Sequence, residues 1–528
     1  MDETFGRRFD RVALCFGPAA GALLSLWLGL SPNWDLRNYH WYNAYALLHG
    51  RLGFDVAVAH HATYYNPLLD LPVWGLAQIA PGWLVAVALG ALHGGNFSLL
   101  YLIGRDSFEL PQRRITAVAL ALCGVTGAFA LALHGTTFYD NLLSLPVLFA
   151  LWRLLQAEVD TRGIALVGLI AGVTVGLKLP VAPFGIGLCA AVVLRAARWR
   201  QRWRWLLWFG ATAALGFLTS AGWWCWRLGQ EFGNPLFPYF NQWLGSELIL
   251  DASYRDTRFL PQSAFDALLF PLRFALDWQV AADGPISDWR IAIAYLLVCA
   301  SLPLGWLGRC NDRPFVTAWR LRVLLGFAGA AYLSWLAVFA IYRYITTLEL
   351  LAPLLAVALI GQWPGSLRRR GLVAAGVLLA MLMTTRVDFG DRRPFGADFV
   401  EVTPPKIARP EASLALMTGV EPMAFAIPAF PPETAFLRVD GWLVGPDRDT
   451  PLLRGMRARI ERHLADAGDL YTIFAEAERE RGDRALDLLG LRRSEQCAFV
   501  RSNLALPLRW CAVEAQSPPR PPERTDAS

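Results

Sequence analysis

The fold is decided where one long apolar run ends and a polar, ring-rich stretch begins. The run is "VALCFGPAAGALLSLWLGL" (residues 12–30), which has no charged residue and is long enough to cross a bilayer as a helix. It continues directly into "SPNWDLRNYHWYNAYALLHGR" (residues 31–51), where acids, bases and aromatic rings are interleaved. Ionisable side chains placed where a helix leaves lipid predict a membrane protein that carries chemistry at the membrane surface.

The composition supports a chain that crosses the membrane many times. Its 528 residues are 55% hydrophobic and only 17% charged, with a mean hydropathy of +0.36. Soluble domains usually carry about 25% charged residues. The net charge of +6 does not indicate a nucleic-acid partner, because the basic residues stand in short clusters between apolar runs.

Hydropathy predicts about eleven membrane spans. They cover residues 12–30, 83–104, 115–134, 140–156, 164–179, 181–197, 205–226, 290–308, 321–341, 345–362 and 371–386. The arginine clusters are Arg7, Arg8 and Arg11, then Arg105, Arg113 and Arg114, then residues 195–204, then Arg309, Arg313, Arg320 and Arg322, and finally residues 368–370. With this number of spans every cluster falls on one side, which the positive-inside rule assigns to the cytoplasm. The N-terminus is then cytoplasmic and the C-terminus extracytoplasmic.

These spans predict an all-α polytopic bundle of about eleven transmembrane helices with extracytoplasmic juxtamembrane helices and a small C-terminal domain. The membrane domain covers residues 1–388, with outer loops at residues 31–82 and 227–289. An extracytoplasmic α/β or α+β domain follows at residues 389–515, and a disordered tail at residues 516–528.

Two features refine this organisation. The piece "NPLLDLPVWGLAQIAP" (residues 66–81) is apolar but short for a span, so we expect a helix lying at the membrane interface. Cys497 and Cys511 lie in the polar C-terminal part and could form a disulfide if that part is extracytoplasmic. The other cysteines behave as small apolar residues in or beside apolar runs: Cys15, Cys123, Cys189, Cys225, Cys299 and Cys310.

Two acids stand out at the predicted outer face. Asp35 precedes a stretch in which Ala44, Leu47 and Leu48 share a helical face, so it is either the N-cap of an amphipathic surface helix or a general base. Asp140, in "HGTTFYD", is either the cap of the fourth span or the second acid of a site. Each acid has aromatic residues and a histidine close by in the sequence, which favours a shared site.

Several cations could complete that site. Lys178 is one of only two lysines and lies at the outer end of the fifth span, where it either snorkels to the interface or binds a phosphate. Arg227 and Arg258 lie in a ring-rich outer loop that could cradle a sugar and a phosphate or simply anchor the chain at the interface. Arg343 either pairs with Glu349 or binds phosphate.

In order, these motifs resemble the C-type fold of integral-membrane glycosyltransferases that use polyprenyl-phosphate sugars. Protein O-mannosyltransferases, the lipid A aminoarabinose transferase and oligosaccharyltransferase subunits belong to that superfamily. The likeness covers roughly residues 10 to 360 and rests on "WDLRNYH", "TYYNPLLDLP", "YLIGRDSF", "HGTTFYD", "AGVTVGLK" and the late Arg343-Tyr344. The chain departs from the family's double acid, because Leu36 follows Asp35, and has Asn66-Pro67 where the family has Pro-Pro.

The resemblance implies a transferase at the outer face of a bacterial inner membrane, with a polyprenyl-phosphate sugar donor and a lipid, glycan or protein acceptor. It implies Asp35 as general base, Asp140 as second acid, and Lys178 with Arg343 or Arg258 as phosphate ligands. The full expected set is Asp35 and Asp140 as catalytic residues, with Arg37, Tyr39, His40, Asn66, His134, Lys178, Arg227, Arg258, Arg343 and Tyr344 binding substrate. No cofactor is specified. No metal-ligand spacing occurs in the sequence, and the departures from the family's motifs leave a divalent cation open.

Two other classes of function fit a polytopic chain. A secondary transporter or lipid flippase predicts ionisable residues near the midplane and two related halves, neither of which the sequence has. A non-catalytic protein of envelope assembly would use the C-terminal domain as its working part. Replacement of Asp35 by Asn separates these classes, because only an enzyme would lose sugar transfer while remaining folded.

Overall fold

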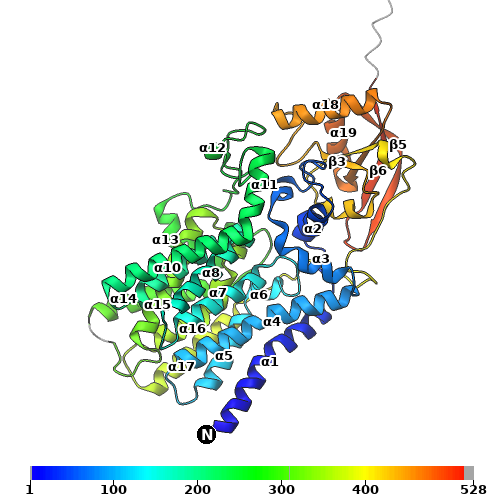
Figure 1. Ribbon diagram of the computed structural model, residues 1–528. Coiled ribbons are helices and arrows are strands. Elements are labelled where there is room, and N and C mark those ends of the chain that lie inside the picture. The colour runs from blue at the N-terminus through cyan, green and yellow to red at the C-terminus, as the bar shows by residue number, and fades with distance from the viewer. Residues whose placement is uncertain (1–2, 308–309, 517–528) are drawn as a thin grey trace, which may run out of the picture. The chain divides into compact units, whose positions relative to one another are not determined.

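The computed structural model describes residues 3–307 and 310–516, and 61% of the chain is helical (Figure 1). The chain divides into two compact units. The helical unit comprises Met1–Ser31, Trp83–Trp223 and Asp256–Pro394, and the sheet-bearing unit comprises Pro32–Gly82, Trp224–Arg255 and Phe395–Ser528. Both predicted outer loops therefore contribute chain to the unit that holds the C-terminal domain, although residues 256–289 stay with the helices.

The helical unit is a bundle in which long helices lie side by side (Figure 1). Its helices are α1 (Glu3–Leu28), α4 (Gly82–Ser107), α5 (Arg113–Val125), α6 (Ala128–Ala132), α7 (Asp140–Leu154), α8 (Thr161–Leu177), α9 (Ala182–Arg195), α10 (Trp199–Phe217), α13 (Ala264–Leu276), α14 (Arg290–Trp306), α15 (Ala318–Val338), α16 (Thr346–Ile360) and α17 (Leu367–Met383). Short turns of 3-10 or π helix are η4 (Leu179–Val181), η5 (Leu218–Gly222), η6 (Trp278–Val280) and η7 (Tyr342–Ile345).

The centre of the bundle is α16, in which every residue is buried. It packs against α5, α7, α14, α15 and α17. A helix that is apolar on all sides must be surrounded by others, and α16 has that composition. Elsewhere small residues bring helices close: Gly17 and Gly21 of α1 face Gly90 and Gly94 of α4, and a Cβ on Gly94 would collide with the Gly17 carbonyl.

The expectation of a membrane protein is supported, but the number of spans is not settled. Among the described residues, five helices are long and apolar enough to cross a bilayer: Thr4–Leu28, Gly82–Ser107, Trp199–Phe232, Ala318–Val338 and Tyr342–Ile360. A helix also occupies each of the other predicted stretches. Those helices are shorter, and the third stretch is interrupted between α5 and α6. Eleven crossings therefore stay a prediction.

The sheet-bearing unit contains a mixed sheet with the strand order β1-β5-β6-β4-β2-β3. Its strands are β1 (Val402–Thr403), β2 (Ser413–Met417), β3 (Ala435–Arg438), β4 (Asp469–Ala475), β5 (Leu491–Ser502) and β6 (Leu508–Ala515). Its helices and turns are η1 (Leu36–His40), α2 (Trp41–Leu48), η2 (His60–Tyr64), η3 (Pro67–Leu69), α3 (Leu71–Ala77), α11 (Trp223–Phe232), α12 (Asn241–Leu244), η8 (Pro410–Ala412), η9 (Ala424–Ala429), α18 (Pro451–Ala465), η10 (Glu476–Glu478) and α19 (Arg479–Asp487). β2 pairs in parallel with β3 and β4, whereas β4, β6, β5 and β1 pair antiparallel.

This sheet confirms the prediction of a small C-terminal sheet domain. Cys497 on β5 and Cys511 on β6 are opposite each other and form a disulfide, which resolves the alternative left open by the sequence. The predicted tail lies, from residue 517 onward, outside the described residues.

The first outer loop covers the exposed edge of the sheet. Val56 donates to the Phe436 carbonyl at 3.0 Å and accepts from the Arg438 amide at 3.0 Å, so it extends the sheet beyond β3. Arg51 holds the loop in place through the carbonyls of Pro432 and Thr434, at 2.7 and 2.8 Å. An uncovered β3 would present unpaired backbone groups, and this pairing removes them.

Candidate functional site

Three charged residues from separate parts of the helical unit meet at one point. The Lys178 Nζ donates to both carboxylate oxygens of Asp140 at 3.1 Å, and the Arg343 Nε lies 3.7 Å from the same carboxylate. The exposed fractions of the side chains are 8% for Asp140, 11% for Lys178 and 20% for Arg343. Lys178, Arg343 and Asp140 are called here the Lys178 cluster.

The local sequence explains why Lys178 and Asp140 stand where they do. Lys178 follows the last residue of α8 and has an extended backbone, because Pro180 in the next turn prevents the α-helix from continuing. Asp140 begins α7 directly after Tyr139, whose backbone is left-handed with φ of 61°. A carboxylate in the first turn of a helix is favoured by the helix dipole. The Lys178 Nζ also donates to the Phe138 carbonyl at 2.8 Å, which fixes the lysine across the loop before α7.

Aromatic rings make cation–π contacts with Arg343 and Lys178. The Arg343 guanidinium lies 4.5 Å from the ring centroid of Phe138 and 5.3 Å from that of Tyr344. The Lys178 Nζ lies 5.8 Å from the Tyr344 centroid. Cation–π contacts of this kind orient a cation without neutralising its charge.

Asp140 and Arg343 of the Lys178 cluster line a cavity with a polar and an apolar side, and its enclosed space is about that of one water molecule. The hydroxyls of Ser144 and Thr347 share a hydrogen bond of 2.8 Å on the polar side, and Thr346 lies beside them. The apolar side includes Val181 and Phe184. A ligand could insert only one small group here, and the rest of it would lie outside the enclosed space.

The other predicted arginine of the phosphate site lies elsewhere. Arg258 is 67% exposed, donates to the Asp256 carboxylate at 2.8 Å and lies 3.4 Å from Asp283. Of the two arginines that the sequence left open, Arg343 is therefore the one that the structure places with Lys178.

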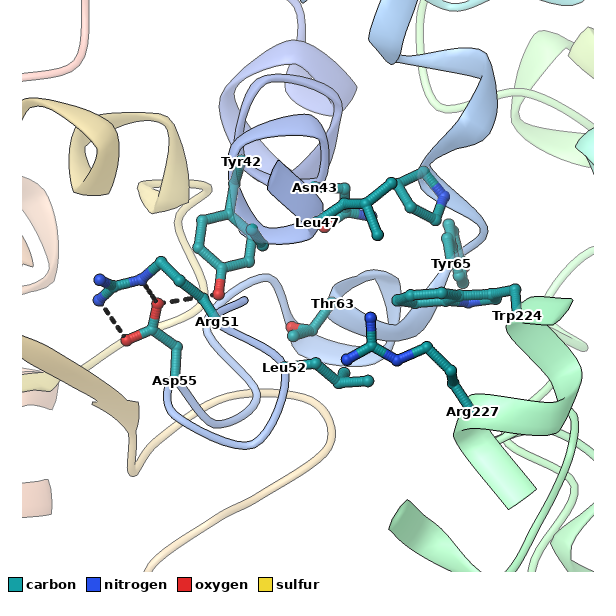
Figure 2. Close-up of a pocket in the computed structure, with 12 residues that line it drawn as sticks. Tyr42, Asn43, Leu47, Arg51, Leu52, Asp55, Thr63, Tyr65, Trp224 and Arg227 are labelled. Atoms are coloured by element: carbon teal, nitrogen blue, oxygen red, sulfur yellow. Dashed lines mark hydrogen bonds and ion pairs between the residues drawn. The ribbon is translucent and has the colours of Figure 1, made fainter. Parts of the chain in front are cut away.

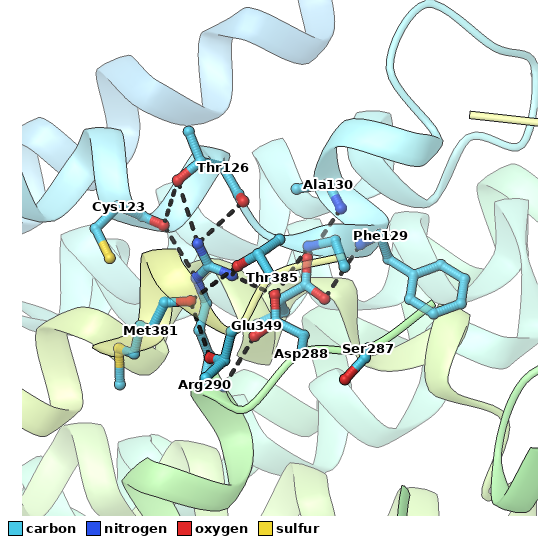
Figure 3. Close-up of polar contacts among 12 residues, drawn as sticks. Cys123, Thr126, Phe129, Ala130, Ser287, Asp288, Arg290, Glu349, Met381 and Thr385 are labelled. Carbon is cyan, nitrogen blue, oxygen red and sulfur yellow. Dashed lines mark hydrogen bonds and ion pairs between the residues drawn. The ribbon is translucent and has the colours of Figure 1, made fainter. Parts of the chain in front are cut away.

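The suggested pair of Arg343 with Glu349 does not form, because Glu349 belongs to a second ionic cluster (Figure 3). Its carboxylate accepts from the amides of Phe129, at 3.3 Å, and Ala130, at 2.9 Å. Next to it, Asp288 is paired with Arg290 and accepts from the Ala128 amide at 2.9 Å. Asp288, Arg290 and Glu349 form the Arg290 cluster, which the sequence did not predict.

All three nitrogen atoms of the Arg290 guanidinium donate hydrogen bonds. It donates to the Cys123 carbonyl at 3.1 Å, the Thr126 carbonyl at 3.0 Å and the Thr385 hydroxyl at 2.6 Å. Arg290 and Glu349 have no exposed surface. The cluster therefore joins α5, α6, α14, α16 and the end of α17, and its role is structural.

In the sheet-bearing unit, the predicted residues of the first loop form a group of hydrogen-bonded acids and rings. The Tyr39 hydroxyl donates to Asp35 at 3.1 Å, and the His40 Nδ1 lies 2.6 Å from the Asp70 carboxylate. The Tyr39 ring contacts those of His40 and Tyr65, with centroids 4.0 and 5.1 Å apart. Asp70 was missed by the sequence argument, although it is the only acid in "NPLLDLPVWGLAQIAP".

Two expectations about this loop are wrong. Asp35 makes no capping hydrogen bond, because its own backbone is helical, and the Asn33 side chain instead accepts from the Leu36 amide at 2.9 Å. The stretch is not a surface helix with one apolar face, since nearly all residues from Leu36 to Tyr45 are buried. The alternative reading of Asp35 as a general base stays a prediction.

The remaining predicted residues have separate places. His134 hydrogen-bonds the Gly21 carbonyl at 2.9 Å inside the helical unit, and Asn66 caps η3 by accepting from the Leu68 amide at 3.1 Å. Arg37 faces Glu421, where burial raises the pKa of the carboxyl and the charge of Arg37 partly opposes that shift. Arg227 is exposed on α11.

The sequence left a divalent cation open. Within residues 3–307 and 310–516, no three His, Cys, Asp or Glu side chains are grouped as metal ligands. Asp140 is already bonded to two cations. No step proposed below uses a metal.

Comparison with known proteins does not assign a family. No protein-family model matches the chain, and comparison with curated proteins and with solved structures gives no match.

Proposed function

We propose that the chain is a membrane glycosyltransferase that moves a sugar from a polyprenyl-phosphate donor to an acceptor hydroxyl at the outer face of a bacterial inner membrane. The single observation that carries the proposal is the Lys178 cluster beside a half-apolar cavity. The order of motifs that resembles the C-type glycosyltransferases supports it.

The Lys178 cluster suits a lipid phosphate in charge and in shape. A phosphate diester needs a cation that can approach as a point charge and a second that can bond two oxygens, which lysine and arginine provide. The apolar wall that includes Val181 and Phe184 would receive the first isoprene unit. Asp140 would hold Lys178 in place and compete with the phosphate for it, so that the leaving polyprenyl phosphate is released after reaction.

The reaction would be a single displacement. Asp35 would take the proton of the acceptor hydroxyl, whose oxygen forms a bond to the anomeric carbon. The bond between that carbon and the phosphate oxygen breaks, and the polyprenyl phosphate leaves with the electron pair. Tyr39, which donates to Asp35, would keep the carboxylate oriented. Asp35 and Asp140 belong to different units.

The test measures phosphate binding and sugar transfer in the full chain reconstituted in nanodiscs. Undecaprenyl phosphate is the probe for binding by native mass spectrometry, and transfer is followed with radiolabelled lipid-phosphate sugars. Lys178→Met should weaken binding about tenfold or more, because a charge-assisted contact is lost. Arg369→Ala, an exposed arginine on α17, is the matched control.

Asp35→Asn separates the classes of function. Loss of transfer with unchanged binding of undecaprenyl phosphate supports the transferase. Binding that responds to Lys178→Met, in a chain that moves lipid phosphate across the bilayer but transfers no sugar, would support the flippase alternative. Binding that is the same in Lys178→Met and in the parent chain would refute both.

A further inference from the structure

The sheet-bearing unit holds a second cavity that the proposed reaction does not use (Figure 2). Its walls come from α2, from the loop between α2 and η3, and from α11. Trp224 and Tyr65 form one side, with Leu47 and Pro67 beside them. The enclosed space is about that of one water molecule, so a ligand can insert only one small group and must lie across the rim.

The rings of this wall are fixed. The Trp224 indole Nε1 donates to the Tyr64 carbonyl at 2.9 Å, and the Tyr65 hydroxyl shares a hydrogen bond of 2.5 Å with that of Tyr239. Ordered aromatic walls lose little entropy when a ligand binds.

Most polar side chains of the cavity already bond to one another. Arg51 is paired with Asp55, and the Tyr42 hydroxyl donates to the same carboxylate at 2.9 Å. Burial, together with the Asp55 charge, raises the pKa of Tyr42 well above its usual value, so the phenol stays a neutral donor. The Thr63 hydroxyl accepts from the Ala59 amide at 2.8 Å. These groups build the wall rather than bind a ligand.

Two groups differ from them. Asn43 is 3% exposed and its Nδ2 donates to the Ala62 carbonyl at 2.9 Å, but within the described chain its Oδ1 accepts no hydrogen bond. Arg227 extends from α11 beneath the Trp224 indole toward Thr63, and its guanidinium has no carboxylate within ion-pair distance among the residues described (Figure 2). A buried acceptor without a donor is costly unless something supplies one.

We infer that this cavity binds a polyol phosphate, with a hydroxyl inserted toward the Asn43 Oδ1 and the phosphate on the Arg227 guanidinium at the rim. The acceptor requires a hydrogen-bond donor, the guanidinium requires an anion, and the fixed rings cover the carbon atoms between them. A soluble sugar or glycerol phosphate and the headgroup of phosphatidylglycerol share this chemistry. The inference does not depend on the transfer reaction at the Lys178 cluster.

The test uses the full chain in phosphatidylcholine nanodiscs and ligand-observed NMR with glycerol 1-phosphate, glycerol and inorganic phosphate as probes. Glycerol 1-phosphate should bind more tightly than either fragment. Arg227→Ala should weaken its binding about tenfold or more, whereas Arg501→Ala, an exposed arginine on β5, should leave it unchanged. Asn43→Ala should remove the preference for glycerol 1-phosphate over inorganic phosphate.

Two further measurements show whether the native ligand is a lipid headgroup or a soluble molecule, and provide a control variant. Nanodiscs with phosphatidylglycerol should reduce the binding of glycerol 1-phosphate if the native ligand is a lipid headgroup, and should not reduce it if the ligand is soluble. Arg369→Ala, at an exposed position on α17, should leave this binding unchanged whether or not the transferase proposal holds. Equal binding by the parent chain and Arg227→Ala, or equal binding of glycerol 1-phosphate and inorganic phosphate by the parent chain, would overturn the inference.

Discussion

The Lys178 cluster and the Arg290 cluster lie in the same unit, each contains an arginine and an aspartate, and they differ in what surrounds their charges. In the Arg290 cluster, the guanidinium and both carboxylates bond to backbone groups of other elements, and Arg290 and Glu349 have no exposed surface. In the Lys178 cluster, Lys178 and Arg343 lie against the Asp140 carboxylate, and Asp140 and Arg343 line a cavity. A buried ionic group that is bonded to the backbone of several elements holds a fold together, whereas one that lines a cavity is placed where it could meet a ligand.

The largest effect should follow from breaking the structural cluster. Arg290→Ala leaves Asp288 buried without its counter-ion and leaves the carbonyls of Cys123 and Thr126 without a donor. Removal of one partner of a buried pair costs about 3–5 kcal/mol, so the folded protein should be largely lost. Size-exclusion chromatography in detergent after graded heating measures this loss. Arg369→Ala serves as the exposed control, and a Tm for Arg290→Ala within about 2 °C of the parent would show that the cluster is not structural.

A subtler change to the same cluster should have an intermediate effect. Glu349→Gln keeps the size of the side chain but directs an NH2 group at the amide of Phe129 or Ala130. One unsatisfied buried donor costs about 1–3 kcal/mol. Thermal unfolding of the reconstituted protein should therefore occur at a lower temperature, while undecaprenyl phosphate binding in the folded fraction stays unchanged. A selective loss of binding would instead place Glu349 in the functional site.

The Lys178 cluster should respond in the opposite way. Asp140→Asn removes the carboxylate that competes with a phosphate for Lys178 and Arg343. The affinity for undecaprenyl phosphate should rise several-fold, corresponding to about 1 kcal/mol or more, because a nearby negative charge is lost. Sugar transfer should fall, since the product phosphate is then released more slowly. Native mass spectrometry and single-turnover transfer measure the two quantities, and weaker phosphate binding in Asp140→Asn would contradict the role given to this acid.

The sequence predicted those parts of the molecule that depend on local composition. Apolar runs located the helices, the clustered arginines gave an orientation, and the scarcity of lysine drew attention to Lys178. The predictions that failed concern contacts between residues that are far apart in the sequence. Arg290 looks like the polar end of a span. Apart from Asp288, its partners lie more than 90 positions away on one side and more than 160 on the other.

The first outer loop also depends on contacts between residues that are far apart in the sequence. Asp35 looks like a cap because an acid before a helix usually is one, but Asn33 reaches the free amide instead. The assignment of the loop to the sheet-bearing unit depends on the pairing of Val56 with Leu437. The Phe436 amide donates a hydrogen bond to the Asp55 carboxylate, and these residues are 381 positions apart in the sequence. No local sequence pattern could indicate a partner at that separation.

The smallest effect should come from the arginine that the sequence treated as equivalent to Arg343. Arg258→Ala removes an exposed pair with Asp256, and exposed pairs contribute about 0–1 kcal/mol. Stability should therefore change little, and undecaprenyl phosphate binding should stay within about twofold of the parent, whereas Arg343→Ala should weaken that binding about tenfold or more because its guanidinium borders the cavity. The pair of variants, measured side by side by native mass spectrometry, tests whether position beside Lys178 rather than charge alone defines the phosphate site. Equal losses of binding in both variants would mean that the ligand also contacts residues outside the Lys178 cluster. The Lys178 cluster alone would then not define the phosphate site.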